Sequence, residues 1–395
     1  MKQIETLVNS YWDTVQEHWH WLHAHPELSG QEEQTAAYIA DALRKMGLTP
    51  TERVGGYGVT ALIEGAKPGK CVGLRADFDA LPLSECTGLP FASQNPGAMH
   101  ACGHDAHTAM LLGAARILCD MRDQFSGTVK LIFQPSEENS ADSGAKKMIA
   151  DGVLQDPKVD AIIGQHVEPV HSSGQIALKK GSLTAASDRF FITVKGKSCH
   201  ASSPHKGVDA VTIGAQIITA LQNIISRTVS PFDNSVITIG KVTAGTRYNV
   251  VAESCEMEGT CRNLNPEVRD EIPQRMENII KGIAEGMGAE YEFTYIRGYS
   301  PLVNDGAMAE LVAATGTELL GEDNVIWLEH AGMGGEDFSF YAEQIPGIFY
   351  RLGCGKEGTP HYPLHNPNFI PDAPALKVGT TVMVASALRF LNGER

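Results

Sequence analysis

Apolar positions in the first half of the chain follow two alternating spacings. Residues 31–46 repeat at helical spacing and end at Gly47, and residues 106–121 have a similar pattern. Short continuous apolar runs separate such stretches and predict strands buried on both faces, at 59–63, 71–74, 128–133 and 161–164. This alternation favours an α/β fold with a mostly parallel buried sheet flanked by helices.

A different pattern begins near residue 187. Strand, helix, strand, strand, helix and strand patterns follow one another at 189–194, 208–227, 235–242, 252–262, 267–288 and 290–295. This β-α-β-β-α-β order is that of a ferredoxin-like domain. Helical spacing over 302–320 and an apolar strand over 347–352 then resume the first pattern. We therefore predict a large domain in two parts, 1–186 and 298–395, interrupted by an inserted domain over 187–297.

Composition and charge narrow the possible partners. The formal net charge is −15, and no long Lys/Arg run is present, so we expect neither nucleic acid nor an anionic membrane surface as a partner. The N-terminal segment lacks the apolar region of a signal peptide, and no run of about 18 apolar residues occurs. The eight cysteines are too scattered for a disulfide scaffold. These features predict a soluble, cytoplasmic protein.

The candidate residues for metal binding or proton transfer come just after predicted strands or lie within one short segment. They are Asp77 and Asp79 after 71–74, Glu137 and Glu138 after 128–133, His166 after 161–164, His365 in a loop after 347–352, and Cys102 and His104 within MHACGHDAHTAM (99–110). The carboxyl ends of strands in a doubly wound sheet meet at one crevice, so we expect these residues to converge. Imidazole, thiolate and carboxylate together suit zinc or a similar divalent ion.

Each of these residues alone has a structural explanation. A cysteine among alanines and glycines is usually a core residue, and a pair of glutamates in a loop is usually solvated. Joint placement at strand ends favours the site. The histidines at 18, 20, 23 and 25 spread around a helix, which indicates a surface or packing role. The segment 334–337, Gly-Gly-Glu-Asp, fits either a turn with a helix N-cap or a substrate contact.

With these residues identified, the chain resembles the M20 metallopeptidase superfamily over nearly its whole length. Within it, the amidohydrolase branch is the most similar; this branch contains hippurate hydrolases, N-acyl-amino-acid amidohydrolases and plant auxin-conjugate hydrolases. The matching motifs are HAHPELSGQEEQT (23–35), RADFDALPL (75–83), MHACGHDAHTAMLLGAA (99–115), LIFQPSEE (131–138), GQHVEP (164–169), KGKSCHASSPHKGVDA (195–210) and GGEDFSFY (334–341). The combination in this order is specific, although no single motif is.

The resemblance implies a metal-dependent amidohydrolase that cleaves N-acetyl, N-benzoyl or longer N-acyl amino acids. It implies two divalent metal ions per chain, zinc or manganese first, with nickel or cobalt as alternatives. The roles that it implies are Cys102 as bridging ligand, His104 and His166 for one metal, Glu138 and His365 for the other, Glu137 as general base, and Asp79 as the carboxylate that orients a ligand histidine. Water activated by the metals would attack the amide.

The resemblance also implies that the inserted domain is a lid and a dimerisation domain. His200, Asn249 and Arg262 match residues that hold the substrate, and Gly334 and Gly335 are further candidates for substrate contact. The chain departs from the family at Ser198-Cys199, where glycines are common, and after Asn249, where Val-Val-Ala replaces the usual Ile-Pro. Both departures bear on the shape of the substrate pocket, and neither touches the metal set. The implied partners are a small-molecule substrate and a second copy of the chain.

Three alternative functions remain open at this point. A dipeptidase, aminopeptidase or aminoacylase of the same superfamily is the nearest, although those branches use aspartate at the position of Cys102. A thiol hydrolase would use Cys102 as nucleophile and a neighbouring histidine as base, which leaves Glu137, Glu138, His166 and His365 without a role. A binding protein that keeps the fold without activity is the third.

Overall fold

The computed structural model describes residues 2–356, 358–359 and 361–393, and the chain divides into two compact units. The first comprises Met1–Leu183, Val303–His330 and Asp337–Arg395, and the second comprises Thr184–Leu302 and Ala331–Glu336. The inclusion of 331–336 in the second unit had no counterpart in the sequence patterns. The predicted domain boundaries at 187 and 297 stay a prediction.

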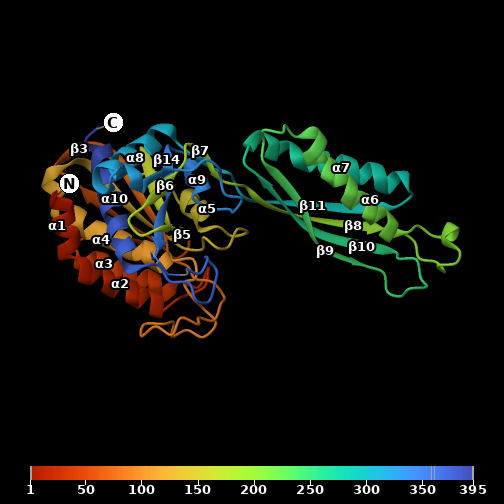
Figure 1. Cartoon of the computed structure of the whole chain (residues 1–395), viewed down its shortest axis with the longest axis horizontal. Helices are drawn as coiled ribbons and strands as arrows, with labels where there is room; N and C mark the ends of the chain where they lie inside the picture. Colours follow the sequence, from red (N-terminus) through yellow and green to blue (C-terminus); the bar gives the residue numbers. More distant parts are fainter. Residues whose placement is uncertain (1, 357, 360, 394–395) are drawn as a thin grey trace. The chain divides into compact units, whose positions relative to one another are not determined.

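A mixed sheet forms the centre of the first unit (Figure 1), with the strand order β1-β2-β4-β3-β5-β14-β6-β13 among the described residues. Its strands are β1 (Thr51–Val54), β2 (Gly58–Glu64), β3 (Lys67–Asp77), β4 (Ser126–Gln134), β5 (Ala161–Ser172), β6 (Ile176–Leu178), β13 (Val325–Trp327) and β14 (Gly347–Gly355). The central strands β4, β3, β5 and β14 run parallel to one another. The pairs β1–β2, β2–β4 and β6–β14 are antiparallel, and β6–β13 is parallel. The four predicted strands fall within β2 to β5, and the α/β prediction is confirmed.

Helices cover both faces of this sheet. They are α1 (Lys2–Ser10), α2 (Trp12–Ala24), α3 (Glu33–Lys45), α4 (His104–Asp120), α5 (Gly144–Ala150), α8 (Gly306–Leu320), α9 (Ser339–Ala342) and α10 (Ala373–Leu391). Within β3, Val72 and Leu74 join the buried core that α4 and α10 cover, and Arg75 and Asp77 point to the opposite face. Because successive side chains of a strand point to opposite faces of the sheet, β3 carries charged residues on one face and apolar residues on the other.

Two sequence predictions differ from the structure in detail. Residues 302–320 were predicted as one helix, but β12 (Leu302–Asn304) pairs with β7 (Gly181–Thr184), and α8 begins only at Gly306. The Asp305 carboxylate accepts the N–H groups of Ala307 and Met308, and this cap sets the helix start. His166 lies inside β5 rather than after it, because β5 continues beside β14.

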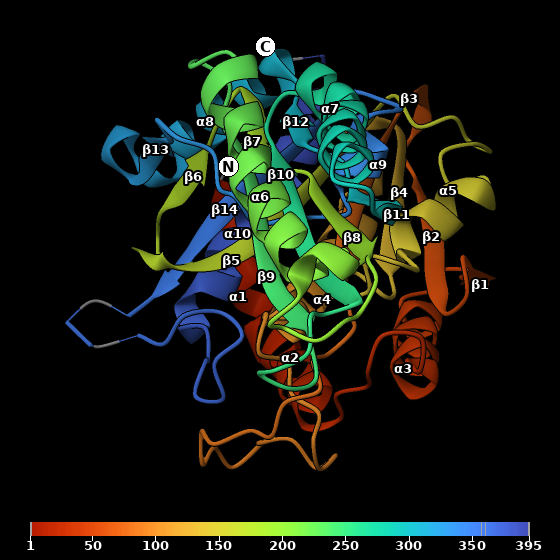
Figure 2. The same ribbon diagram turned by 90° about the vertical axis from the view of Figure 1, so that its right-hand side faces the viewer.

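The second unit is a separate sheet with two helices. Its elements are β8 (Ser187–Lys195), α6 (Ala210–Asn223), β9 (Ser235–Ala244), β10 (Ser254–Asn263), α7 (Pro266–Gly286) and β11 (Glu290–Tyr299). The strand order β11-β8-β10-β9 is antiparallel throughout, and both views place α6 and α7 on one face of the sheet (Figures 1 and 2). The predicted β-α-β-β-α-β order is present. Among the described residues of the chain, no helix has both the length and the apolar composition to cross a membrane.

Candidate metal centre

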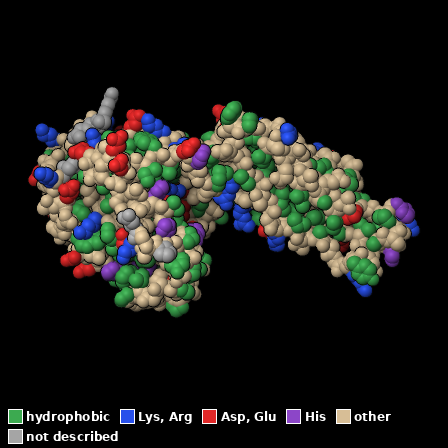
Figure 3. Space-filling view, in the orientation of Figure 1, with side chains coloured by type: hydrophobic (Ala, Val, Ile, Leu, Met, Phe, Trp, Pro, Cys, Tyr) green, Lys and Arg blue, Asp and Glu red, His purple; other side chains and the backbone are tan. Residues whose placement is uncertain are grey.

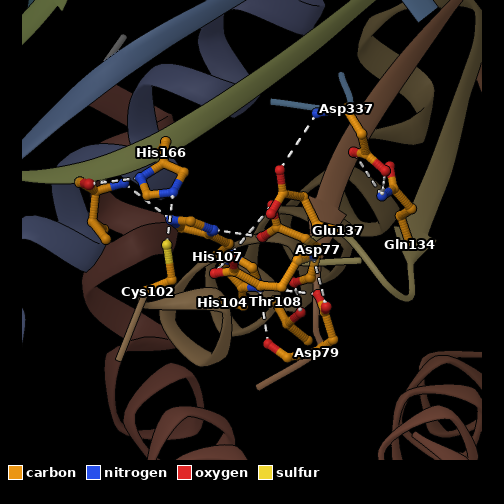
Figure 4. A network of polar contacts seen from close by, with 12 residues as sticks. Asp77, Asp79, Cys102, His104, His107, Thr108, Gln134, Glu137, His166 and Asp337 are labelled. Carbon is orange, nitrogen blue, oxygen red and sulfur yellow. Dashed lines mark hydrogen bonds and ion pairs between the residues drawn. The ribbon is translucent and has the colours of Figure 1, made fainter. Parts of the chain in front are cut away.

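His104 is the first residue of α4, and its ring is oriented by Asp79. The Nδ1–H group donates to the Asp79 backbone oxygen at 2.9 Å and lies 3.1 Å from Asp79 Oδ1 (Figure 4). Nε2 is buried without a hydrogen-bond partner among the described residues. Gly103 precedes the helix at φ +81°, and a Cβ there would lie 2.4 Å from a Val167 methyl. The turn therefore requires glycine and leaves Nε2 without a hydrogen-bond partner in the described part of the chain. Burial opposes a charge on His104, but Asp77, Asp79 and Glu138 outweigh it and raise the pKa to about 10, so a metal ion at Nε2 would take the place of a proton.

The Asp79 carboxylate also fixes the loop that carries the two glutamates. Its Oδ2 accepts the Ser29 hydroxyl at 2.6 Å and the Glu138 N–H at 3.0 Å. Burial would raise the pKa of Asp79, but hydrogen bonds from His104, Ser29 and Glu138 lower it below the ordinary 3.8. Asp79 is thus a carboxylate that holds two predicted ligands.

Cys102 lies where the remaining predicted ligands meet. Its Sγ is 3.4 Å from His166 Nε2 and 3.3 Å from His365 Nε2, which lies 3.3 Å from Glu138 Oε1. His166 Nδ1 donates to the Val167 backbone oxygen at 2.7 Å, so its Nε2 faces the thiol. Burial lowers the pKa of His166 well below 6.5, so the ring is neutral, the form that binds metals.

Five groups of possible donor atoms occur among the described residues, and two of them share Cys102. Cys102, His104 and His166 make one and Cys102, Glu138 and His365 the other, with all donor atoms in each group within 4.8 Å of one another. Only Cys102 belongs to both. Besides His104 Nε2, Glu138 Oε1 is buried without a hydrogen-bond partner among the described residues. Sulfur, nitrogen and carboxylate oxygen at these distances fit zinc or a similar divalent ion.

Glu137 lies at the edge of both groups. Its side chain is 6% exposed, and a carboxylate oxygen lies within 4.8 Å of donor atoms of His104 and Glu138. The Asp337 N–H donates to Glu137 Oε1 across 3.4 Å (Figure 4). A buried carboxylate beside two donor groups is well placed to move a proton there.

The family of the chain follows from comparison with known proteins. The sequence pattern of peptidase family M20/M25/M40 matches residues 73–389. The chain belongs to this family. It is 42% identical to N-acetylcysteine deacetylase of Bacillus subtilis, with 94% of this chain and 95% of that one covered. It is 45% identical to N-acyl-L-amino acid amidohydrolase of Geobacillus stearothermophilus over 72% of this chain and 76% of that one.

Solved structures of the M20 family show the same fold. The Bacillus subtilis YXEP protein, described as a dinuclear metal binding peptidase, superposes with a TM-score of 0.83 at 37% identity. The match covers 97% of this chain and 99% of that protein. The inserted-domain architecture is therefore shared with an M20 relative of known structure.

A buried charge network next to Glu137 was not predicted from the sequence. Arg75, 1% exposed, donates to Asp77 Oδ2 at 2.6 Å and to Asp337 Oδ1 at 2.7 Å. Gln134 also donates to Asp337, at 2.9 Å. Asp337 is thus a structural partner of Arg75, and its N–H holds Glu137. An arginine within an apolar strand was the available signal, but its partner lies 262 positions away.

His107 continues this network. Its Nδ1 lies 2.6 Å from Asp77 Oδ1, and its Nε2 accepts the Val167 N–H at 2.9 Å. A backbone N–H can only donate, so His107 is neutral with its proton on Nδ1. Both ring nitrogens are occupied, and His107 braces the strand next to His166.

His23, predicted as a surface or packing residue, is 1% exposed and part of a second polar network. Its Nδ1 lies 2.6 Å from Asp105 Oδ2, and its Nε2 lies 3.2 Å from Glu85 Oε1. Trp19 Nε1 donates to the same Asp105 oxygen at 2.9 Å. The network ties α2 to the start of α4, and a helical spacing of histidines gave no indication of it.

This pairing predicts a pH-dependent contribution to stability. Burial opposes the charge on His23, but Asp105 and Glu85 outweigh it and raise the pKa to about 9. Because the folded pKa exceeds the unfolded 6.5, the contribution is complete below pH 6.5 and is lost as pH rises through about 9. His23→Gln should therefore lose most stability near pH 6.5, on the order of 3 kcal/mol, and progressively less towards pH 9.

Thermal unfolding of wild type and His23→Gln between pH 6 and pH 9.5 measures this difference. His330→Gln alters an exposed histidine and serves as the control. Its unfolding temperature should differ from that of the wild type by the same amount at every pH. If the difference in unfolding temperature between wild type and His23→Gln stays constant across this pH range, the charged pair is contradicted.

The predicted substrate residues lie in the second unit. His200 is exposed, and its Nδ1 accepts the Ser202 N–H at 3.1 Å, so the neutral ring carries its proton on Nε2. Asn249 and Arg262 are half-buried, and Asn249 Oδ1 has no hydrogen-bond partner among the described residues. A Cβ at Gly335 would lie 2.5 Å from the Tyr299 ring, so packing alone requires glycine there. Gly334 accepts the Ala185 N–H and has open space around its Cα.

Proposed function

We propose that the protein hydrolyses the amide bond of N-acyl amino acids and releases a carboxylic acid and a free amino acid. It is a metal-dependent M20 hydrolase that acts on amide bonds. The observation that carries the proposal is the pair of donor groups that share Cys102, with the buried Glu137 carboxylate beside them.

The ligand assignment follows the two groups. Cys102 would bridge two divalent ions, His104 and His166 would complete the protein ligands of one, and Glu138 and His365 those of the other. Zinc or manganese is the first choice, with nickel or cobalt as alternatives. When bound, such a pair supplies Lewis acidity to the substrate carbonyl and to a water molecule.

The remaining residues have roles in proton transfer and orientation. Glu137 takes the proton of the attacking water and delivers it to the departing amide nitrogen. Asp79 keeps the His104 proton on Nδ1, so that Nε2 stays available for the metal. The Asp337 N–H keeps the Glu137 carboxylate facing the donor groups.

A thiol nucleophile is disfavoured by the surroundings of Cys102. Burial, Glu138 and Glu137 raise the pKa of this thiol well above 9, whereas a nucleophilic cysteine needs a lowered pKa. Because the proposed reaction depends on bound metal, chelation should abolish activity. A thiol hydrolase would survive the chelator and lose its activity to iodoacetamide.

A substrate screen tests the proposed reaction. Metal-free protein is reloaded with Zn²⁺, Mn²⁺, Co²⁺ or Ni²⁺ and offered N-acetyl, N-benzoyl and longer N-acyl amino acids beside dipeptides with a free amino group. We expect turnover of at least one N-acyl amino acid that exceeds turnover of every dipeptide. Preference for the dipeptides would favour a peptidase, and no turnover of any compound would favour a binding protein.

We propose further that the second unit holds the substrate and forms a homodimer in the cytoplasm. Asn249 and Arg262 offer an amide and a guanidinium, His200 an Nε2–H donor, and Gly334 and Gly335 a backbone that can lie close to a ligand. All eight cysteines are free, in keeping with a reducing compartment.

The α6 groove, lined by Val211, Ala215 and Thr219 with Ile283 of α7, is the proposed dimer contact. Val211 is 47% exposed, and hydrophobic side chains gather over α6 (Figure 3). Ala215→Arg should convert a dimer to a monomer, because a guanidinium would be buried without a partner. Sedimentation velocity measures the change, and Gln274→Arg on exposed α7 should leave the dimer intact. A wild type that sediments as a monomer would contradict the proposal.

A further inference from the structure

The loop that carries both glutamates begins with an unfavourable backbone conformation. β4 ends at Gln134, and Ser136 has φ +53°, in the left-handed region that residues with a Cβ rarely adopt. Glu137 and Glu138 follow directly. Such a conformation persists only where surrounding groups hold it. The directions of the Glu137 and Glu138 side chains therefore depend on the groups that bind Ser136.

Glu32 holds Ser136 from the opposite side of the loop. Its Oε1 accepts both the Ser136 N–H at 2.9 Å and the Ser136 hydroxyl at 3.1 Å. The Ser136 backbone oxygen accepts the Gly144 N–H at 3.2 Å. The N–H, carbonyl and hydroxyl groups of this one residue are therefore all bound, two of them by one carboxylate.

The position of Glu32 is not explained by its own helix. It immediately precedes α3, yet Glu27 caps that helix, with its carboxylate accepting the N–H and hydroxyl of Thr35. Glu32 is 0% exposed, and its Oε2 makes no hydrogen bond to the described residues. Burying a carboxyl group with one oxygen unbonded is unfavourable, and the two hydrogen bonds from Ser136 offset part of this cost.

We propose that Glu32 is a positioning residue for the catalytic loop. It keeps Ser136 left-handed, so that Glu137 and Glu138 reach the donor groups from one turn. The inference rests on the proposed function, in which Glu137 is the base. Asp337 binds Glu137, and Asp79 binds Glu138. Glu32 binds Ser136, whose backbone conformation sets the direction of both.

Kinetics with saturating metal and an N-acyl amino acid that the wild type cleaves test this role. Glu32→Ala should lower kcat on the order of 10- to 100-fold with KM nearly unchanged, because a small displacement of the base is costly. Glu32→Gln keeps an oxygen acceptor and should retain most of kcat. Glu27→Ala, the matched control, should lower the unfolding temperature through loss of the α3 cap and leave kcat unchanged.

Ser136→Gly separates positioning from simple packing. Glycine adopts positive φ without a penalty, so the Glu32→Ala/Ser136→Gly double variant should recover part of the lost kcat. A purely structural Glu32 would leave the double variant no better than Glu32→Ala. Should Glu32→Ala fail to fold, Ser136→Val with Glu32 intact serves instead: it should lose kcat, whereas Ser136→Gly should not. Wild-type kcat in folded Glu32→Ala or in Ser136→Val would overturn the proposal.

Amide hydrogen exchange gives a readout that does not need turnover. The Ser136 N–H should be protected in wild type and Glu32→Gln, and should exchange faster in Glu32→Ala. If the screen finds no substrate, the proposed function fails while this measurement still tests Glu32. Unchanged protection of Ser136 in Glu32→Ala would overturn the positioning role.

Discussion

Glu137→Gln is expected to lower turnover by about 10²- to 10⁴-fold while metal content stays near that of the wild type. The amide keeps the shape of the side chain and an oxygen to accept the Asp337 N–H, but it cannot take a proton. Substrate binding should persist, so that KM changes much less than kcat. Atomic absorption and the hydrolysis of one N-acyl amino acid measure both quantities.

Glu138→Gln separates the two adjacent glutamates. Its carboxylate lies in the group with Cys102 and His365, so this change should weaken metal binding, and added metal should restore part of the activity. Added metal should not restore Glu137→Gln. Glu343→Gln, at an exposed glutamate, is the control for the substitution itself. Near-normal turnover of Glu137→Gln, or its rescue by metal, would show that the base lies elsewhere.

Cys102→Ser is expected to weaken both metal sites at once. Cys102 Sγ is the only donor atom common to the two groups, so loss of the thiolate removes a ligand from each ion. Changes to residues that merely orient a ligand already cost about 10- to 100-fold in metal affinity, and we expect loss of the shared ligand to cost more. Metal content after dialysis should fall below one equivalent per chain, with loss of activity.

Cys86→Ser removes an exposed thiol and should leave metal content and activity unchanged. Replacing Asp79 would be a poorer control, since Asp79 holds both His104 and Glu138. Two retained equivalents of metal in Cys102→Ser would contradict the bridging role of the cysteine.

The location of the site could be predicted from the sequence because two kinds of information agreed. Apolar runs located β3, β4 and β5, and strand geometry brings their carboxyl ends together, so residues such as Asp79 and Glu138 had to converge. The motifs then supplied roles that spacing alone leaves open. The structure brings the donor atoms of Cys102, His104 and His166 within 4.8 Å of one another, although His166 lies inside its strand.

The supporting residues could not be predicted, because their partners are remote in sequence. Glu32 binds Ser136 across 104 positions, and His23 binds Asp105 across 82. A helical or strand period indicates which face a residue occupies, but not which polar group it meets there. Arg75 illustrates the limit: its place in an apolar strand signalled a buried partner, and only the fold identifies Asp337.

The most direct test of the account is activity measured against metal equivalents. Metal-free protein is titrated with Mn²⁺ or Zn²⁺, and hydrolysis of an N-acyl amino acid is followed together with bound metal per chain. We expect no turnover without metal and a maximum at two bound ions, with Glu137→Gln binding both ions and remaining inactive. Turnover by metal-free protein that iodoacetamide abolishes would contradict it.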